Sequence, residues 1–238
     1  NVSIGDTIIT ESEKGYDIGS VTLTGELVRI QLKKKGINID DELFSLKRFP
    51  NGMEISKWQE LMRKESEIQV RARIIAIDLG LKMKISDVEF QADGSKVIFY
   101  YTADQRVDFR ELIKKYAAEF KTRIEMKQVG LRQEASRLGG IGSCGRELCC
   151  STWLNDFRKV NTSAARYQKL SINPQKLAGQ CGKLKCCLNY ELDTYIDALK
   201  DFPKKDIKIK TTKGIAILQK TDIFKEIVWY SYKNNFMD

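Results

Sequence analysis

A duplicated cysteine motif constrains the fold of this chain more than any other feature. The segment SCGRELCC at residues 143–150 is followed by QCGKLKCC at residues 180–187, so each cysteine of the first segment recurs 37 residues later. In both copies a glycine follows the first cysteine, and a basic residue follows the glycine. The spacing predicts an internal duplication inside a cysteine-rich helical and loop region, residues 139–203. The two copies hold all six cysteines of the chain: Cys144, Cys149, Cys150, Cys181, Cys186 and Cys187.

The grouping of these cysteines favours metal ligation over disulfide bonding. Adjacent cysteines rarely bridge each other, because a disulfide needs well-separated Cα atoms, and secreted frameworks spread their cysteines along the chain. Thiolates are soft ligands that select zinc, copper(I) or iron–sulfur clusters. All six cysteines are therefore candidate metal ligands. We expect Cys144 in a loop, and Cys149 and Cys150 near the start of a helix that carries Trp153.

Three states of the thiols remain open at this point. A zinc ion would take four thiolates, two from each copy, with the copies related by a local pseudo-twofold axis. An iron–sulfur cluster would take three thiolates from one copy and a fourth ligand from elsewhere, since a full cluster normally has four. The third state is free of metal, with Cys150 and Cys187 packed as small apolar side chains.

The absence of histidine excludes much of enzyme chemistry. With no histidine in the chain, there is no Ser-His-Asp or Cys-His nucleophile pair, no HExxH zinc helix and no histidine-ligated zinc. A metal-dependent nuclease would need a cluster of carboxylates, and none stands out by its spacing. A thiol oxidoreductase would typically carry a C-x-x-C motif, which is absent from the sequence. We therefore expect a protein that is not an enzyme.

The net charge of +9 favours a polyanionic partner, such as RNA, DNA or an anionic surface. Three basic residues, Arg146, Lys183 and Lys185, lie next to the cysteines and are candidates for contact with nucleic acid or a partner protein. Their alternative role is to offset thiolate charge or to face solvent.

No run of 18 apolar residues exists, so no segment is expected to span a bilayer. The chain begins with Asn1 rather than Met, which is compatible with a preceding segment.

Alternating apolar and polar residues predict a small β domain at residues 1–55. Strands are expected at 7–10, 19–25 and 27–32, with glycines between them. They would form a small barrel-like sheet. The β-rich segment at residues 204–234 is expected to complete this barrel, because short strands with open edges need partners.

Residues 56–138 predict an α/β sandwich. Ser56 and Gln59 form the pattern of a capping box, which starts a helix expected over 57–78. Strands at 83–91 and 96–102 are joined at Asp93-Gly94, a strong hairpin signal. An apolar stripe over 109–120 predicts a second helix. A strand around Ile124 and a short helix over 132–138 follow. If residues 43–49 supply a leading strand, the order is that of the split βαβ, ferredoxin-like fold. The predicted fold class is α+β.

The chain resembles the bacterial YaaT/RicT family. The resemblance is carried by the two cysteine motifs, by the segment DVEFQADGSKVIFYYTADQRVDFRELIKKYAAEF before them and by LNYE after them. That family carries a C-terminal domain first described in a yeast polymerase-suppressor protein. The resemblance is close over residues 82–195 and looser before them. It implies that the six cysteines bind an iron–sulfur cluster of the 4Fe–4S type, with zinc as the alternative.

The resemblance also implies a function. Members of this family are cytoplasmic, non-catalytic regulatory subunits that assemble with two small helical partner proteins. The complex acts with a membrane-tethered endoribonuclease in mRNA processing and turnover. This function is compatible with contact between the chain and RNA, and with membrane association only through a partner. The alternative from another class is a nucleic-acid-associated binding module in DNA replication or repair. Co-purification of a ribonuclease or of polymerase subunits discriminates between the two.

Overall fold

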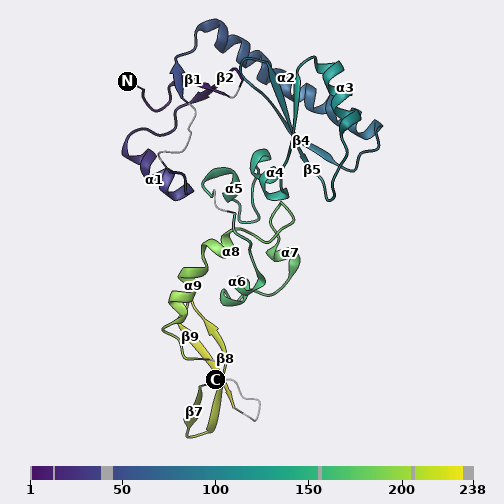
Figure 1. Ribbon diagram of the computed structural model, residues 1–238. Coiled ribbons are helices and arrows are strands. Elements are labelled where there is room, and N and C mark those ends of the chain that lie inside the picture. The colour runs from purple at the N-terminus through teal and green to yellow at the C-terminus, as the bar shows by residue number, and fades with distance from the viewer. Residues whose placement is uncertain (1, 13, 39–44, 155–156, 205–206, 233–238) are drawn as a thin grey trace. The chain divides into compact units, whose positions relative to one another are not determined.

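Three small sheets and the helices between them make up a mixed α+β fold (Figure 1). The computed structural model describes residues 2–12, 14–38, 45–154, 157–204 and 207–232. The chain divides into two compact units, Asn1–Gly130 and Leu131–Asp238. The predicted α+β class is confirmed. Among the described residues no sheet closes into a barrel, so the prediction of a barrel-like part is wrong.

The first sheet is antiparallel and has the order β2-β1-β3. It consists of β1 (Thr7–Glu11), β2 (Tyr16–Ser20) and β3 (Leu46–Arg48). The strand expected over 7–10 is confirmed, whereas the strand expected over 19–25 ends at Ser20. Residues 43–44 of the strand expected over 43–49 lie outside the described residues. The described part of that segment contains β3, which pairs with β1 and is not the first strand of the second sheet.

The strand expected over 27–32 is a helix, α1 (Glu26–Lys35). Its residues Leu, Arg, Gln and Lys are strong helix formers, although their apolar members also alternate as in a strand. Glu26 lies in the first turn, and Gly36 closes the helix in the left-handed conformation, with φ of 67°. A glycine in that conformation is a common helix terminator. The loss of this strand leaves too few strands for the expected barrel.

The second sheet has the order β4-β5-β6. Its strands are β4 (Lys84–Phe90), β5 (Lys96–Thr102) and β6 (Arg123–Gln128). The hairpin predicted at Asp93-Gly94 is confirmed, because β4 and β5 pair antiparallel around that turn. Helix α3 (Arg110–Phe120) connects β5 to β6, which pair in parallel. The ferredoxin-like order is wrong, since that fold places another strand between the two that are parallel here.

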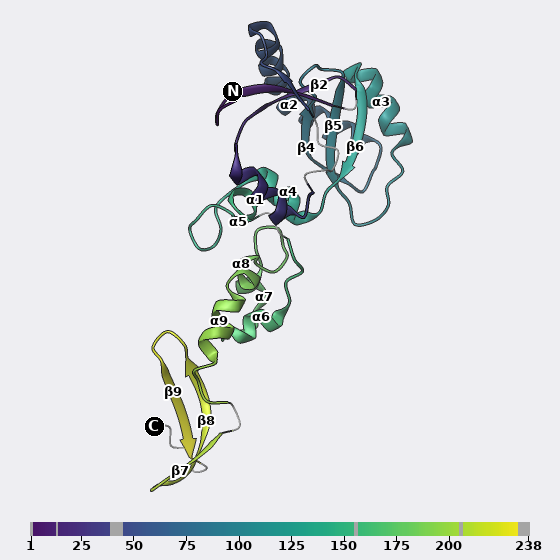
Figure 2. The ribbon, with the colours of Figure 1, turned by 60° about the vertical axis from the view of Figure 1, so that its left-hand side comes forward.

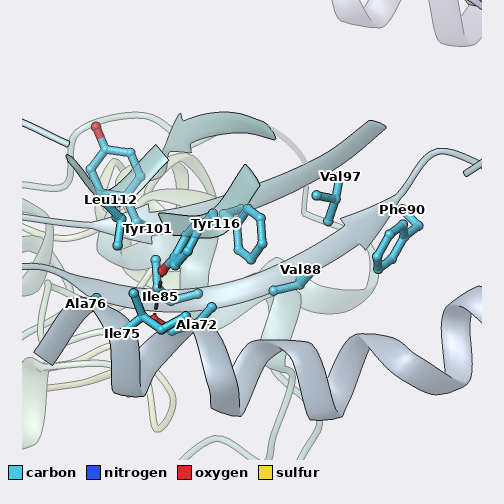
Figure 3. Close-up of a cluster of buried hydrophobic side chains, with 11 residues drawn as sticks. Ala72, Ile75, Ala76, Ile85, Val88, Phe90, Val97, Tyr101, Leu112 and Tyr116 are labelled. Carbon is cyan, nitrogen blue, oxygen red and sulfur yellow. Dashed lines mark hydrogen bonds between the residues drawn. The ribbon is translucent and has the colours of Figure 1, made fainter. Parts of the chain in front are cut away.

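The main core lies between the second sheet and the helices α2 (Gly52–Asp78) and α3 (Figure 3). Tyr116 of α3 is fully buried, and its hydroxyl donates a 2.8 Å hydrogen bond to the carbonyl of Ala72 on α2. Its ring packs 4.6 Å, centroid to centroid, from the ring of Phe99 on β5. Both helices therefore cover the same face of the sheet. The buried residues of this core are Ala72, Ile75, Ala76, Ile85, Val88, Phe90, Val97, Phe99, Tyr101, Leu112 and Tyr116.

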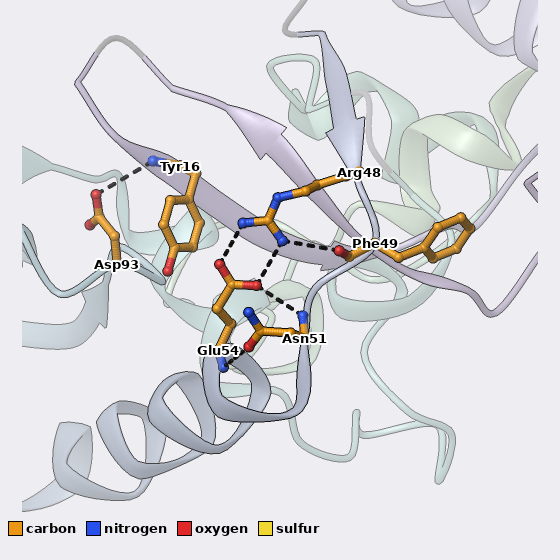
Figure 4. Close-up of polar contacts among 6 residues, drawn as sticks. All are labelled: Tyr16, Arg48, Phe49, Asn51, Glu54 and Asp93. Atoms are coloured by element: carbon orange, nitrogen blue, oxygen red, sulfur yellow. Dashed lines mark hydrogen bonds and ion pairs between the residues drawn. The ribbon is translucent and has the colours of Figure 1, made fainter.

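Helix α2 (Gly52–Asp78) begins five residues earlier than expected. Its capping box is formed by Asn51 and Glu54, not by Ser56 and Gln59. The Glu54 carboxylate also accepts two hydrogen bonds from the guanidinium of Arg48, at 2.6 and 2.8 Å (Figure 4). This network fixes the start of α2 to the end of β3. The Asn-Gly pair that looks like a turn in the sequence is the helix start itself.

The outer edge of β4 is covered by polar side chains of α2. The Glu65 carboxylate accepts a 3.0 Å hydrogen bond from the backbone N–H of Phe90. Gln69 donates to the carbonyl of Ser86 at 2.5 Å, and Arg73 donates to the carbonyl of Ile85 at 2.8 Å. Because these three side chains are four residues apart, they form one row along the helix. The row satisfies backbone groups that an edge strand would otherwise leave open.

The second unit consists of short helices followed by the third sheet (Figure 2). This sheet is antiparallel with the order β7-β8-β9, so the C-terminal strands pair with one another and do not complete an N-terminal barrel. Residues 205–206 and 233–234 of the segment expected to do so lie outside the described residues. The elements are α4 (Leu131–Leu138), α5 (Cys149–Thr152), α6 (Thr162–Tyr167), α7 (Pro174–Leu177), α8 (Cys187–Tyr190), α9 (Leu192–Leu199), β7 (Lys208–Thr211), β8 (Gly214–Asp222) and β9 (Ile227–Tyr232).

Candidate thiol centre

The two cysteine segments have the same backbone structure. In the first, the N–H of Gly142 donates to the carbonyl of Arg146 at 2.7 Å, and in the second, the N–H of Gly179 donates to the carbonyl of Lys183 at 2.8 Å. A lone β-bridge closes each turn, between Ile141 and Glu147 and, 37 residues later, between Ala178 and Leu184. A short helix follows each turn. The repeated sequence therefore folds twice into one local structure.

The glycine after the first cysteine has a clear role in both turns. Gly145 and Gly182 have φ angles of 79° and 73°. Side chains with a Cβ atom rarely adopt these angles, whereas glycine does so without cost. The turn brings the first cysteine, in the loop, back toward the cysteine pair at the start of the helix. Cys144 lies in the loop and Cys149 and Cys150 open α5, as expected, although α5 ends at Thr152 and Trp153 only caps it.

All six thiols line a single cavity of about 350 Å³. None of them is in a disulfide. Loop residues of both turns, Gly142 and Gly179, also line the cavity, and Ala135 of α4 contributes from outside the turns. The cysteines of both turns therefore share one cavity in the second unit, and metal ligation by them stays a prediction.

The two turns meet at equivalent positions. Trp153 and Tyr190 are 37 residues apart, and their rings contact each other with centroids at 4.5 Å. The side chain of Gln180 in the second turn donates to the carbonyl of Ile141 in the first. Contact between equivalent residues is what a two-fold relation produces at its axis. The cavity therefore lies between two halves that are built alike.

Helix α4 connects the two turns. Ser136 donates through its hydroxyl to the carbonyl of Cys150 in the first turn. One turn of helix earlier, the Nη2 atom of Arg132 donates to the carbonyl of Leu184 in the second turn, at 2.9 Å. Residues four apart lie on the same helix face. The face that carries Arg132, Ala135 and Ser136 is thus turned toward the cavity.

Burial raises the pKa of three of these thiols. It raises the pKa of Cys150 and of Cys186, and the neighbouring thiols raise both pKa values further. The guanidinium of Arg132 opposes both shifts. Burial also raises the pKa of Cys187, with Glu191 adding to the shift. Metal binding at this site must therefore displace protons from the thiols.

The chemistry of the cavity fits a thiophilic metal centre. Zinc or an iron–sulfur cluster takes four ligands, and the six cysteines of the two turns are enough to supply them. The Nε atom of Arg132 is buried and has no hydrogen-bond partner among the described residues. A bound thiolate or sulfide would give this atom an acceptor. Within the described residues, however, no three His, Cys, Asp or Glu side chains are arranged as a finished ligand set.

The basic residues predicted beside the cysteines lie in different environments. Lys185 lines the cavity, and its charge lowers the pKa of Cys187 against the larger effect of burial. Arg146 and Lys183 have exposed side chains and contribute their backbone carbonyls to the two turns. Arg132 is the cation that sequence reasoning missed. It precedes the first motif by eleven residues, and only the fold of α4 brings it to the thiols.

The fold and the cavity define a mixed α+β chain built around a duplicated cysteine turn. Family models match it at three places: the PSP1 C-terminal conserved region at residues 45–129, the third domain of PSP1-like proteins at residues 159–202, and the YaaT C-terminal domain at residues 210–238. No solved structure matches the chain with significance. Among the described residues, no helix has the length and apolar character needed to cross a bilayer.

Curated relatives give the same assignment. The stage 0 sporulation protein YaaT of Bacillus subtilis is 41% identical over 225 residues, which cover 93% of this chain and 78% of the relative. Protein PSP1 of Saccharomyces cerevisiae is 50% identical over 44 residues, or 18% of this chain and 5% of the relative. An uncharacterized protein of Schizosaccharomyces pombe is 50% identical over 46 residues, 19% of this chain and 6% of the relative. The chain belongs to the YaaT family.

Proposed function

We propose that this chain is a non-catalytic, cytoplasmic adaptor whose duplicated cysteine turns hold an iron–sulfur cluster, or alternatively zinc. As part of a complex with small helical proteins and an endoribonuclease, it regulates the processing and turnover of mRNA. The observation that carries the metal part of this proposal is the single cavity lined by thiols of both turns. Family membership supports the regulatory part, since the Bacillus subtilis relative is named as a sporulation protein.

The thiols of both turns would supply the ligands, and Arg132 would balance their charge. A centre with four thiolate ligands carries net negative charge, which a cation at hydrogen-bond distance stabilises. Bound there, the centre supplies a cross-link between the two turns, and an iron–sulfur cluster makes that link sensitive to oxidation. Because each turn is only a few residues long, such a link would fix the surface around it.

A docking role follows from where the cross-link lies. The turns are joined to α4, α5 and α8, so a change at the thiols alters the surface that these short helices present. The chain has no histidine, which leaves it without the most common acid–base group of enzymes. Regulation by binding therefore suits this chain better than catalysis.

The test is anaerobic purification with quantification of iron, acid-labile sulfide and zinc. We expect a charge-transfer absorbance band with iron and sulfide, or stoichiometric zinc. Cys149→Ser and Cys186→Ser, which change equivalent positions of the two turns, distinguish one shared centre from two. If the centre is shared, either variant loses all of the metal, whereas with two separate centres each variant loses half of the metal. Ser143→Ala, beside the first cysteine, is the control that retains full metal.

The functional part of the proposal has its own measurement. The wild-type chain, isolated from cells with its partners, should bring down an endoribonuclease and the small helical proteins, and the cysteine variants should recover less of them. A well-folded protein without metal contradicts the first part. Recovery of DNA polymerase subunits in place of a ribonuclease contradicts the second and favours the replication or repair module.

A further inference from the structure

The C-terminal sheet has one covered face and one open face. Paired residues on neighbouring strands lie on the same face of a sheet. Ala216, which pairs with Ile209 and Tyr232, is buried, and so is Thr221, which pairs with Val228. These residues mark the covered face.

The opposite face carries lysines around a tryptophan. Lys208 pairs with Ile217, and Lys220 pairs with Trp229, while Lys210 follows Lys208 by two positions. The side chains of all three lysines are exposed, and the indole of Trp229 is partly exposed. The Nζ atom of Lys220 lies over the indole ring, 5.1 Å from its centroid. We call this surface, Lys208, Lys210, Ile217, Lys220 and Trp229, the open face.

The charge on the open face is uncompensated. Among the described residues, none of its three lysines forms an ion pair with a carboxylate. Asp222 lies near its end, but the carboxylate accepts hydrogen bonds from the backbone N–H groups of Phe224 and Lys225, both at 3.1 Å. That carboxylate is therefore held in the turn between β8 and β9. The face thus carries three lysines and, at its end, one carboxylate that is already hydrogen-bonded.

Protection of an edge strand does not explain this arrangement. Lysines on edge strands often prevent sheets from joining, which would account for Lys208 and Lys210 on β7. Lys220, however, is on β8, the central strand, where no edge needs protection. Its position above an indole leaves a charge and an aromatic ring side by side on a flat surface.

We propose that the open face binds a single-stranded polynucleotide, with its phosphates on the three lysines and a base against Trp229. Proteins that bind unpaired strands combine a positive surface with aromatic rings on which bases stack. A paired base inside a duplex cannot reach such a ring, which is why the proposal specifies single strands. The surface lies outside the cysteine turns, so this binding does not depend on the thiol centre.

The experiment uses the whole chain and labelled oligonucleotides of about 15 nucleotides. Fluorescence anisotropy is measured with oligouridylate, oligothymidylate, duplex RNA and phosphatidylserine vesicles, from about 50 to about 200 mM salt. We expect binding of the single strands only. A higher affinity for oligouridylate than for oligothymidylate identifies RNA as the natural ligand. Equal affinity for the two means that the face binds single-stranded RNA and DNA alike, and both results support the proposal.

The variants separate this face from general charge attraction. The double variant Lys208→Gln, Lys220→Gln should bind about tenfold more weakly and make the slope of log K against log salt shallower by about 1.4, because each phosphate contact contributes about 0.7 on single strands. Trp229→Ala should weaken binding, and Trp229→Phe should restore most of it. Lys225→Gln, in the β8–β9 turn, is the control and should bind like the wild type.

Two outcomes overturn the proposal. The first is binding of duplex RNA or vesicles as tight as that of single strands, which indicates only general attraction of polyanions. The second is binding that Lys225→Gln weakens as much as the double variant does. Circular dichroism and thermal unfolding of each variant show that the sheet remains folded, so that a loss of affinity is not a loss of structure.

Discussion

Arg132 shows how much one side chain contributes to the candidate centre. Its guanidinium donates to the carbonyls of Leu184 and Arg158, at 2.9 and 3.4 Å, and its buried Nε atom has no acceptor among the described residues. A buried donor without a partner costs about 1–3 kcal/mol. Binding of an anionic centre would relieve this cost. If the cysteines hold such a centre, as proposed, Arg132 would act on it through the cysteines, and this effect is measurable.

Replacing Arg132 should weaken metal binding without removing a ligand. We expect Arg132→Gln to lower the affinity for zinc or the stability of the cluster about 10- to 100-fold, as changes next to metal ligands typically do. It should also raise the pKa of Cys150 and Cys186, because the guanidinium now lowers both. Competition with a chelator measures the first effect, and the pH dependence of thiol alkylation measures the second.

The matched control for this change is Arg146→Gln. Arg146 lies in the first turn, but its side chain is exposed and does not line the cavity. Metal retention should be that of the wild type. If Arg146→Gln loses as much metal as Arg132→Gln, general charge around the turns, rather than the buried guanidinium, is responsible.

Glu54 gives a prediction about acid stability. Its hydrogen bonds from Arg48 and from the backbone of Asn51 lower its pKa to about 2, from about 4.3 in an unfolded chain. A depressed carboxyl pKa stabilises the folded state above the unfolded value, and the contribution is lost as pH falls from about 4.3 toward 2. In Glu54→Gln, unfolding by urea should show less loss of stability over this range. An unchanged acid profile would contradict the role of the pair.

At the scale of elements, α2 is both a core helix and a cover for the β4 edge. Its apolar side packs into the main core, and the row of Glu65, Gln69 and Arg73 occupies the backbone groups of β4. One helix thus performs two tasks that many folds assign to separate elements. The row predicts that a single polar residue on α2 controls the exposure of a particular strand amide.

Glu65→Ala is the test of this edge cover. Without the carboxylate, the N–H of Phe90 loses its acceptor, and we expect a loss of about 1 kcal/mol in unfolding free energy. Exchange of the Phe90 amide with deuterium should accelerate more than that of amides on β5. Glu67→Ala, an exposed position on the same helix, should leave this exchange unchanged. Equal acceleration in both variants would mean that helix charge, rather than the bond, matters.

Sequence reasoning succeeded for elements with strong local signals and failed where two patterns coincide. The β4–β5 hairpin is marked by Asp93-Gly94, and that prediction is confirmed. Residues 27–32 alternate like a strand, but four of the six are good helix formers and glycines flank the segment, and the helix α1 results. An Asn-Gly pair is common in turns, but here Asn51 is the N-cap of α2 and Gly52 is its first residue. The start of this helix therefore resembles a turn in the sequence.

At the scale of the whole molecule, pairing between distant segments was the hardest feature to predict. Which strand pairs with which depends on contacts that no local pattern encodes, so the barrel and the ferredoxin-like order were both wrong. The duplicated cysteines, in contrast, can be recognised directly in the sequence. Their shared cavity lies between two turns that have the same backbone structure. The position of Arg132 could not be predicted, since it depends on how α4 packs.

The pairing of Trp153 with Tyr190 has a consequence for how such a site can arise. Each turn contributes one wall, so a polypeptide with a single copy would have only half an enclosure. It could complete the enclosure only by associating with another molecule of itself. Tandem copies in one chain remove that dependence on concentration, and they also free the two halves to diverge, as the exchange of tryptophan for tyrosine already illustrates.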